Sequence, residues 1–327
     1  MELVDLYKLA GIHLGLATEA YAVLRGEAQQ EVQGVTENKY RDEAADAVVT
    51  TVEILTEVAA KAINKARGTY ITIESPALRQ PPGPVHLALS RLLADTLKNV
   101  FAKIGLEAAA PVLVVGLGNW QATPDSLGPK VVGKMFVTRH LLQYAPGVLP
   151  AGTRPVAALA PGVLGITGIE TAEIIAGVVS HLKPGLVIAI DSLAARNVTR
   201  LYSTIQIADS GIDPGSGIGN RRTALSRAEM GVPVLALGIP TVVPAAVIAM
   251  ETLNSAGQRN RNLQGELGPP AIQAIISDLL APFGGDLTVT PKEVDDLVTR
   301  TATLLAQGLN LALFPQLSPE DLAMLSA

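Results

Sequence analysis

The chain has 327 residues, enough for one large domain or two ordinary ones with a sizeable buried core. Hydrophobic residues make up 48% of it but aromatic residues only 3%, so Ala, Val, Leu and Ile must build the core. A formal net charge of −5 excludes a generally basic surface and argues against direct nucleic-acid binding. The absence of cysteine excludes disulfides, thiolate metal ligands and a cysteine nucleophile, and it is typical of an intracellular protein.

The sequence gives no sign of membrane insertion. The first residues lack a basic segment followed by a clean apolar core, so we expect no secretory signal. The strongest candidate for a membrane span is Val232–Met250, which carries no charge. Three prolines inside it would break a spanning helix, so a buried strand followed by a helix is the preferred interpretation. We therefore expect a cytoplasmic protein that does not contact a membrane.

The N-terminal part of the chain divides into an arm and a β-rich region. Residues 1–45 show no strong strand pattern and predict an amphipathic arm, which is polar and acidic from Glu27 to Asp46, and residues 46–327 predict a single domain. Two β-rich stretches within 46–75 predict a small N-terminal subdomain with strands at Ala47–Leu55 and Thr69–Glu74. The intervening residues 56–68 fit either a helix or a strand and a turn.

From residue 85 onward the pattern alternates between helices and short, fully apolar strands. The expected strands are Val112–Val115, Val156–Leu159, Leu186–Ile190, Ser203–Ala208 and Val234–Leu237. The expected helices are 85–104, 127–144, 171–182 and 243–253, followed by two C-terminal helices within 271–310. Thr290, Pro291 and Glu293 have the spacing of a capping box for the last helix. The alternation predicts an α/β fold with a mostly parallel, twisted sheet and helices on both faces.

Several common catalytic motifs are absent from the chain. It has no G-x-S-x-G elbow, no phosphate-binding G-x-x-x-x-G-K-[ST] loop and no H-E-x-x-H helix. The four histidines are His13, His86, His140 and His181. Their spacing is not that of metal ligands, so we expect no bound metal and no cofactor.

Two glycine-rich loops need separate interpretation. Gly116 and Gly118 follow a strand as in a dinucleotide fold, but Gln121 stands where the third glycine belongs, which disfavours nucleotide binding. The second loop, 209–220, matches neither a phosphate nor a calcium pattern. Two interpretations of it stay open: a tight surface turn, or a loop whose amides line a cleft.

Two aspartates each follow an apolar strand. Asp125 lies in the loop after one strand, and Asp191 ends another. Ligands of open α/β sheets sit beyond the carboxyl ends of the strands, so the carboxylates converge if these strands are neighbours. One of two close carboxylates keeps its proton and can polarise a carbonyl, while the other activates water. From spacing alone the simpler role, in which each aspartate caps a following helix, is favoured.

Long blocks around these aspartates resemble the germination protease family of spore-forming bacteria. The resemblance covers most of 112–243 and resumes in the last quarter of the chain. The matching blocks are VVGLGNWQATPDSLGP, VTRHLL, APGVLGITGIET, VIAIDSLAAR, TIQIADSGIDPGSGIGNRR, GVPVLALGIPTVV and LTVTPKEVDDL. Blocks of this length and density are highly specific.

The resemblance implies an atypical aspartic-type endopeptidase that degrades small acid-soluble spore proteins during germination. The family's T-P-D-x-L-G-P and I-A-I-D motifs place its catalytic aspartates at Asp125 and Asp191. It also implies a fold akin to the hydrogenase maturation proteases, a homotetramer, and a zymogen made in the developing spore. The family's processing region matches Gly15–Glu19, and Gly15 stands where an acidic residue normally precedes the cut.

The family cuts after an acidic residue, usually Glu, which calls for a cationic partner in the enzyme. Arg139 and Arg196 are the candidates by position, although each is equally well explained as a solubilising surface charge. Asn119 is a third substrate-binding candidate, either fixing its loop or holding the carbonyl of the scissile bond. Arg221 and Arg222 are weaker candidates.

Two alternatives to the aspartic endopeptidase are retained. One is a metal-dependent, maturation-type peptidase that reads a bound nickel, in which His140 would be the first ligand to test. The other is a non-catalytic homologue on the same scaffold that binds and shields spore proteins.

Overall fold

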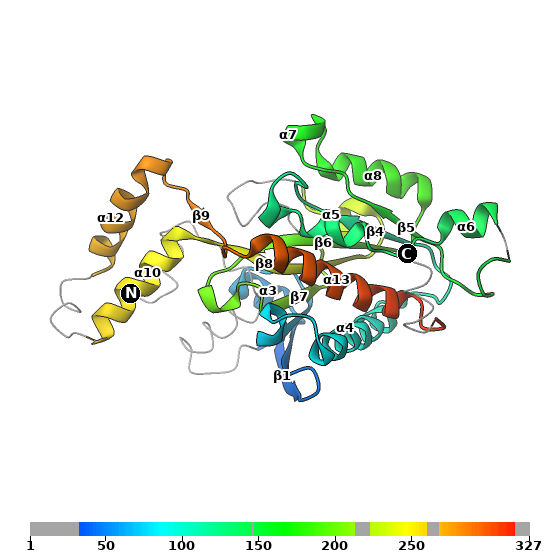
Figure 1. Cartoon of the computed structure of the whole chain (residues 1–327), viewed down its shortest axis with the longest axis horizontal. Helices are drawn as coiled ribbons and strands as arrows, with labels where there is room; N and C mark the ends of the chain where they lie inside the picture. Colours follow the sequence, from blue (N-terminus) through cyan, green and yellow to red (C-terminus); the bar gives the residue numbers. More distant parts are fainter. Residues whose placement is uncertain (1–32, 146, 213–222, 260–267, 318–327) are drawn as a thin grey trace.

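One continuous mixed sheet forms the centre of the molecule (Figure 1). The computed structural model describes residues 33–145, 147–212, 223–259 and 268–317. In these ranges the sheet has nine strands in the order β1-β2-β3-β7-β8-β6-β4-β5, with β9 paired to β8. The strands are β1 (Val35–Asp42), β2 (Ala47–Ile54), β3 (Gly68–Glu74), β4 (Val112–Gly116), β5 (Val156–Leu159), β6 (Leu186–Ala194), β7 (Thr204–Ala208), β8 (Val234–Pro244) and β9 (Thr288–Val289).

The helices cover both faces of this sheet, as the alternating pattern predicts. The longer helices are α4 (Pro84–Lys103), α8 (Thr171–Leu182), α10 (Ala245–Arg259), α12 (Pro269–Leu280) and α13 (Val294–Leu313). The shorter ones are α3 (Glu57–Ile63), α5 (Leu127–Val132), α6 (Arg139–Tyr144), α7 (Leu164–Thr167) and α9 (Arg227–Met230). Short 3-10 turns are η1 (Pro76–Arg79), η2 (Thr123–Asp125), η3 (Val198–Arg200) and η5 (Ala281–Phe283).

Strand β4 shows how the sequence builds the two layers. All five of its residues are buried, and successive side chains point to opposite faces of the sheet. Val112 and Val114 pack in one core with α4 and α13, whereas Leu113 and Val115 pack in the other with α8. Full burial of each such side chain stabilises the fold by about 1.5–3 kcal/mol. The predicted α/β fold with helices on both faces is confirmed.

The sheet is parallel in only one half. Strands β5, β4, β6 and β8 run parallel, and β7, β3, β2 and β1 add on antiparallel. The β-rich N-terminal strands therefore extend the same sheet. Strand β1 was not expected, because its exposed residues show no apolar alternation; it is held by pairing with β2 across its whole length. The undecided segment 56–68 contains helix α3, which Thr56 caps.

The helix predicted at 127–144 is wrong as a single element. Helix α5 ends at Gly133, and α6 starts again at Arg139. The chain between them bonds to its surroundings: the Phe136 N–H donates to Asn310 Oδ1 at 3.0 Å, and the Thr138 N–H donates to the Val156 carbonyl at 3.0 Å. These tertiary bonds replace the helical ones, which local spacing does not reveal.

The C-terminal third differs from expectation at one helix start. The Thr290 hydroxyl donates to the Thr241 carbonyl at 2.9 Å, and α13 starts at Val294 with Glu293 at the N-cap position and no side-chain cap. The predicted capping box is therefore wrong. The uncharged stretch 232–250 contains β8 and the start of α10, as the strand-and-helix interpretation predicts. In the part of the chain described, no helix combines the length and apolarity needed to span a bilayer.

Candidate active site

The two aspartate-bearing segments belong to neighbouring strands of the sheet. Strands β4 and β6 are parallel neighbours, with Gly116 opposite Ile190. The Leu117 N–H donates to the Ile190 carbonyl at 2.8 Å, so the backbones are joined at the last residue before each segment diverges. The loop that contains Asp125 and the residue Asp191 therefore lie at the same carboxyl edge of the sheet, where α/β proteins place their ligands.

Glycines allow this edge to be closely packed. A Cβ placed on Gly116 would lie 2.2 Å from the Gly128 carbonyl oxygen. A Cβ placed on Gly128 would lie 2.3 Å from the Leu117 oxygen and 2.7 Å from the Ile190 oxygen. Helix α5 therefore starts directly against the end of β4 and against Ile190 of β6, with no room for any side chain between them.

Asp125 is turned back toward its own strand. Its Oδ2 accepts the Asn119 N–H at 2.7 Å, closing the loop that contains Trp120. Gly118 makes this closure possible, with a φ of +110° and the Asp125 main chain against its α-carbon. The residue at the N-terminus of α5 is Ser126, so the interpretation of Asp125 as a helix cap is wrong.

Asp191 is a buried carboxylate on a strand. It is 8% exposed, and its Oδ1 accepts the Ser192 N–H at 2.8 Å. Strand β6 continues beyond it to Ala194, and Asp191 is paired in register with Gly238 of β8. The alternative that Asp191 caps a helix is therefore wrong too, because no helix begins there. Burying a charged carboxylate destabilises the folded protein by several kcal/mol unless polar groups surround it. Buried carboxylates are therefore typical of functional positions.

Asn119 fixes the loop beside Asp125. Its Oδ1 accepts the Gln121 N–H at 2.9 Å, forming a local turn. The first of the two roles considered for Asn119 is therefore present in the structure.

The two candidate arginines lie at opposite edges of the sheet. Arg196 is 6% exposed and follows β6 by two residues, on the same edge as the aspartates. Arg139 begins α6 and lies at the amino ends of β4 and β5, beside Pro111 and Pro155. Within one chain, Arg139 is thus separated from the aspartates by the length of the parallel strands. His140 follows it on α6 and shares that remote position.

The wall of the site opposite β4 is built from the C-terminal residues. Turn η2 packs against α13, where the Thr123 hydroxyl donates to Asp295 Oδ1 at 3.1 Å. Tyr202 lies nearby and is fully buried; burial raises its pKa above the ordinary value, with Asp295 adding to the effect. The Asp125 turn is therefore clamped between the sheet and α13.

Trp120 was not singled out by sequence reasoning. Its side chain is 48% exposed, and its ring lies over Gly162, where an added Cβ would come within 3.1 Å. Leu164, Ile166 and Ile169, in and just after α7, are exposed apolar residues of the same surface. The available signal was the chain's single tryptophan next to Asn119 in a glycine-rich loop.

Some predicted features fall outside the described residues. These are the processing region Gly15–Glu19, Arg221, Arg222 and most of the loop 209–220. The described start of that loop has a structural role, since Asp209 Oδ1 accepts the Thr69 N–H at 2.7 Å. Among the residues with described positions, no group of three His, Cys, Asp or Glu side chains lies close enough to hold a metal ion.

The fold and this edge define an α/β protein with one aspartate in a loop, a second aspartate on a buried strand, and a buried arginine at the same end of the sheet. The family model described as germination protease matches residues 15–259 and 257–326. A germination protease of Clostridium acetobutylicum is 43% identical, covering 95% of this chain and 98% of that protein. The germination protease of Clostridium perfringens strain 13 is 42% identical over the same shares, and that of Bacillus cereus strain AH187 is 38% identical over 98% of both chains.

The chain belongs to the germination protease family and is a peptidase of spore germination. A solved structure, the [NiFe] hydrogenase maturation protease HycI from Thermococcus kodakarensis KOD1, is 16% identical with a TM-score of 0.33. It covers 65% of this chain and 98% of its own. A likeness of this size adds nothing to the fold as described above.

Proposed function

We propose that this chain is an aspartic-type endopeptidase that degrades small acid-soluble spore proteins, using Asp125 and Asp191 and no metal or cofactor. The observation that supports it most is the pairing of the two segments by the Leu117–Ile190 hydrogen bond. Neighbouring strands lie about 4.8 Å apart, so a residue on β6 and a residue in the loop that follows β4 can act on one substrate bond. Each carboxylate also accepts a backbone N–H, which fixes its orientation.

In the proposed reaction, the charged carboxylate removes a proton from water as that water attacks the scissile carbonyl. The protonated carboxyl group donates a hydrogen bond to the carbonyl oxygen, where negative charge develops. The proton taken from water then passes to the leaving amine. The Asn119 side-chain amide donates a second hydrogen bond to the carbonyl oxygen, in addition to shaping the loop.

Arg196 is proposed to read the glutamate before the cut. It is buried on the same edge as the aspartates, where a guanidinium binds a carboxylate strongly through two parallel hydrogen bonds. Arg139 is not part of this proposal for a single chain, because it lies at the other edge of the sheet.

Assembly and processing are proposed from the family resemblance. The enzyme is proposed to act as a homotetramer in the cytoplasm of the developing spore and the spore core, without membrane or nucleic-acid partners. It is made as a zymogen that loses part of the arm 1–45, ahead of a single peptidase domain. Since β1 begins at Val35 and pairs fully with β2, the removed segment has to end before it.

Replacement of the two aspartates tests this function. Asp191→Asn and Asp125→Asn are expected to stay folded and to lose cleavage of a purified small acid-soluble spore protein, followed by mass spectrometry. The control is Asp95→Asn, whose carboxylate is exposed on α4. Fragments ending in Glu are expected from the processed wild-type protein. Cleavage by both aspartate variants would sink the proposal, and an absence of fragments from every processed form would favour a binding protein.

The metal-dependent alternative is weakened by one observation: His140, its first ligand to test, lies on α6 at the remote edge. Loss of cleavage in a chelator, with recovery on adding one metal ion, would support that alternative over the aspartate pair.

A further inference from the structure

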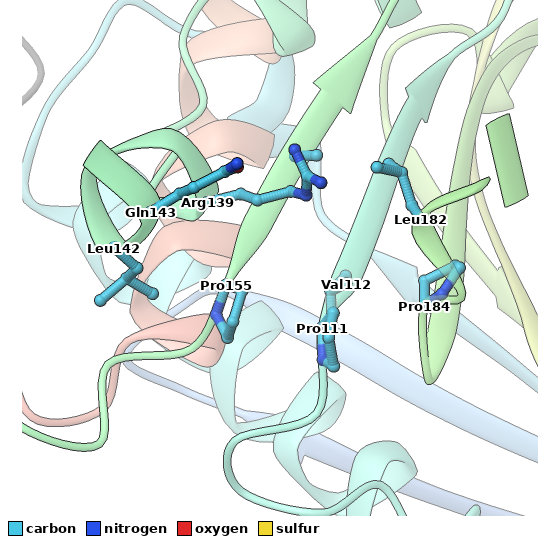
Figure 2. Close-up of a pocket in the computed structure, with 9 residues that line it drawn as sticks. Pro111, Val112, Arg139, Leu142, Gln143, Pro155, Leu182 and Pro184 are labelled. Atoms are coloured by element: carbon cyan, nitrogen blue, oxygen red, sulfur yellow. The ribbon is translucent and has the colours of Figure 1, made fainter. Parts of the chain in front are cut away.

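A surface pocket of about 310 Å³ lies at the edge of the sheet opposite the aspartates. Pro111, Pro155 and Pro184, which precede β4, β5 and β6, form its floor, and Leu142 of α6 and Leu182 of α8 form its sides (Figure 2). None of the described residues that line it is acidic. The pocket plays no part in the proposed hydrolysis.

The floor of this pocket offers few hydrogen-bonding groups. Proline has no N–H, so these three residues offer the pocket no backbone donor. The Pro111 carbonyl already accepts the Gly185 N–H at 2.8 Å, and the Pro155 carbonyl accepts the Val112 N–H at 2.9 Å. An apolar group can therefore pack against Pro111 and Pro155 without leaving either of these two carbonyls unpaired.

The polar capacity of the pocket comes from Arg139 and Gln143, one turn apart on α6. Figure 2 shows the Arg139 side chain extending from α6 across β5 toward β4, and the Gln143 side chain pointing from α6 toward β5. The start of α6 is fixed by Thr138, which is fully buried and whose hydroxyl accepts the Val156 N–H at 2.9 Å. Within the described ranges, no hydrogen bond or ion pair involves the Arg139 side chain.

We propose that this pocket binds an aliphatic carboxylate, with the carboxylate on Arg139 and the hydrocarbon on the proline floor. A guanidinium binds a carboxylate through two parallel hydrogen bonds, and the Gln143 amide can donate a third. The pairing of the exposed Arg139 cation with an apolar, donor-poor floor selects a ligand that carries one negative group on a short hydrocarbon. Both a free carboxylic acid and an acidic residue next to an aliphatic one in a peptide have this chemistry.

Calorimetric titration with hexanoate tests the pocket, and hexanamide serves as the neutral probe of equal shape. Hexanoate is expected to bind saturably, one per chain, and at least about tenfold more tightly than hexanamide. Methyl NMR is expected to show the shifts at Leu142, Leu182 and Val112. A parallel titration with N-acetyl-Leu-Glu amide distinguishes the sources: saturable binding assigns the pocket to an acidic peptide, and binding of hexanoate alone assigns it to a free acid.

Three variants separate direct contact from a general positive field. Arg139→Ala is expected to weaken hexanoate binding at least about tenfold. Arg139→Lys is expected to weaken it less, because lysine keeps the positive charge but cannot form the two parallel hydrogen bonds of a guanidinium. Lys183→Gln removes an exposed cation between two lining residues and is expected to change affinity less than about twofold. Thermal unfolding verifies that each variant is folded. Equal affinities for the acid and the amide, or unchanged binding in folded Arg139→Ala and Arg139→Lys, would overturn the assignment.

Discussion

The backbone N–H of Leu117 bonds to the carbonyl of Ile190 at 2.8 Å, one residue before Gly118 on one side and directly before Asp191 on the other. This bond sets the spacing of the two candidate catalytic segments. Gly128 is packed against both of its partners, since an added Cβ would lie 2.3 Å from the Leu117 oxygen and 2.7 Å from the Ile190 oxygen. Three backbone segments therefore determine the site before any side chain is considered.

Gly128→Ala is expected to destabilise the protein by about 1–3 kcal/mol, because the new methyl group overlaps main-chain atoms that cannot rotate away. Peptidase activity is expected to be lost even where the protein stays folded, because the new methyl group forces Leu117 and Ile190 away from α5 and so displaces the two aspartates. Thermal unfolding and cleavage assays measure the two effects. Gly133→Ala is the matched control: its nearest atoms lie 3.7 Å from the added Cβ, and its φ is −63°. A Gly128→Ala protein as stable and active as Gly133→Ala would contradict this packing.

Trp120→Ala is expected to raise KM for a protein substrate several-fold while changing kcat less. The exposed ring lies in the loop that Asp125 closes and over Gly162, so it is available to a bound chain, and it carries no group that takes part in the proposed hydrolysis. Trp120→Phe is expected to restore part of the loss. Because the chain has a single tryptophan, its fluorescence reports binding to an Asp191→Asn protein directly. No spectral change at saturating substrate would argue against this contact.

Asp295→Ala is expected to lower kcat several-fold with little effect on KM. Asp295 Oδ1 accepts the Thr123 hydroxyl at 3.1 Å and so holds the turn that ends at Asp125. An exposed hydrogen bond of this kind is worth about 0.5–1.5 kcal/mol, so global stability changes little. Asp296→Ala is the matched control, since Asp296 lies in the same helical turn but pairs with Arg300 of α13. Equal kinetics in the two variants would exclude a positioning role for Asp295.

His86 is expected to make stability depend on pH. Burial lowers its pKa, Arg300 lowers it further, and a bond to the Gln80 backbone opposes the shift. Below pH 6.5 the unfolded chain binds a proton that the folded chain resists, so stability is complete above that pH and falls as the pH decreases. His86→Gln is expected to flatten this slope in denaturant titrations between pH 5 and 7. The exposed His181, replaced in the same way, is the control; equal slopes in the two variants would refute the assignment.

Much of this fold could be predicted from local pattern. Strands such as Val156–Leu159 and helices such as Thr171–Leu182 coincide with their predicted bounds, because a short apolar run and a 3.6-residue spacing are local signals. The break in 127–144 could not be predicted, since the Phe136–Asn310 bond links residues 174 apart in the chain. Strand β1 gave no signal because almost all of its side chains are exposed.

The sequence by itself determined that Asp125 and Asp191 each follow an apolar run, and its motifs placed the chain among germination proteases. The sequence could not determine strand order, because order depends on which backbones exchange hydrogen bonds across long separations. Only the tertiary structure made β4 and β6 neighbours, turned both carboxylates onto backbone N–H groups and excluded the capping role favoured by spacing. It likewise separated Arg139 from Arg196, since residues at the two ends of parallel strands stay a strand length apart.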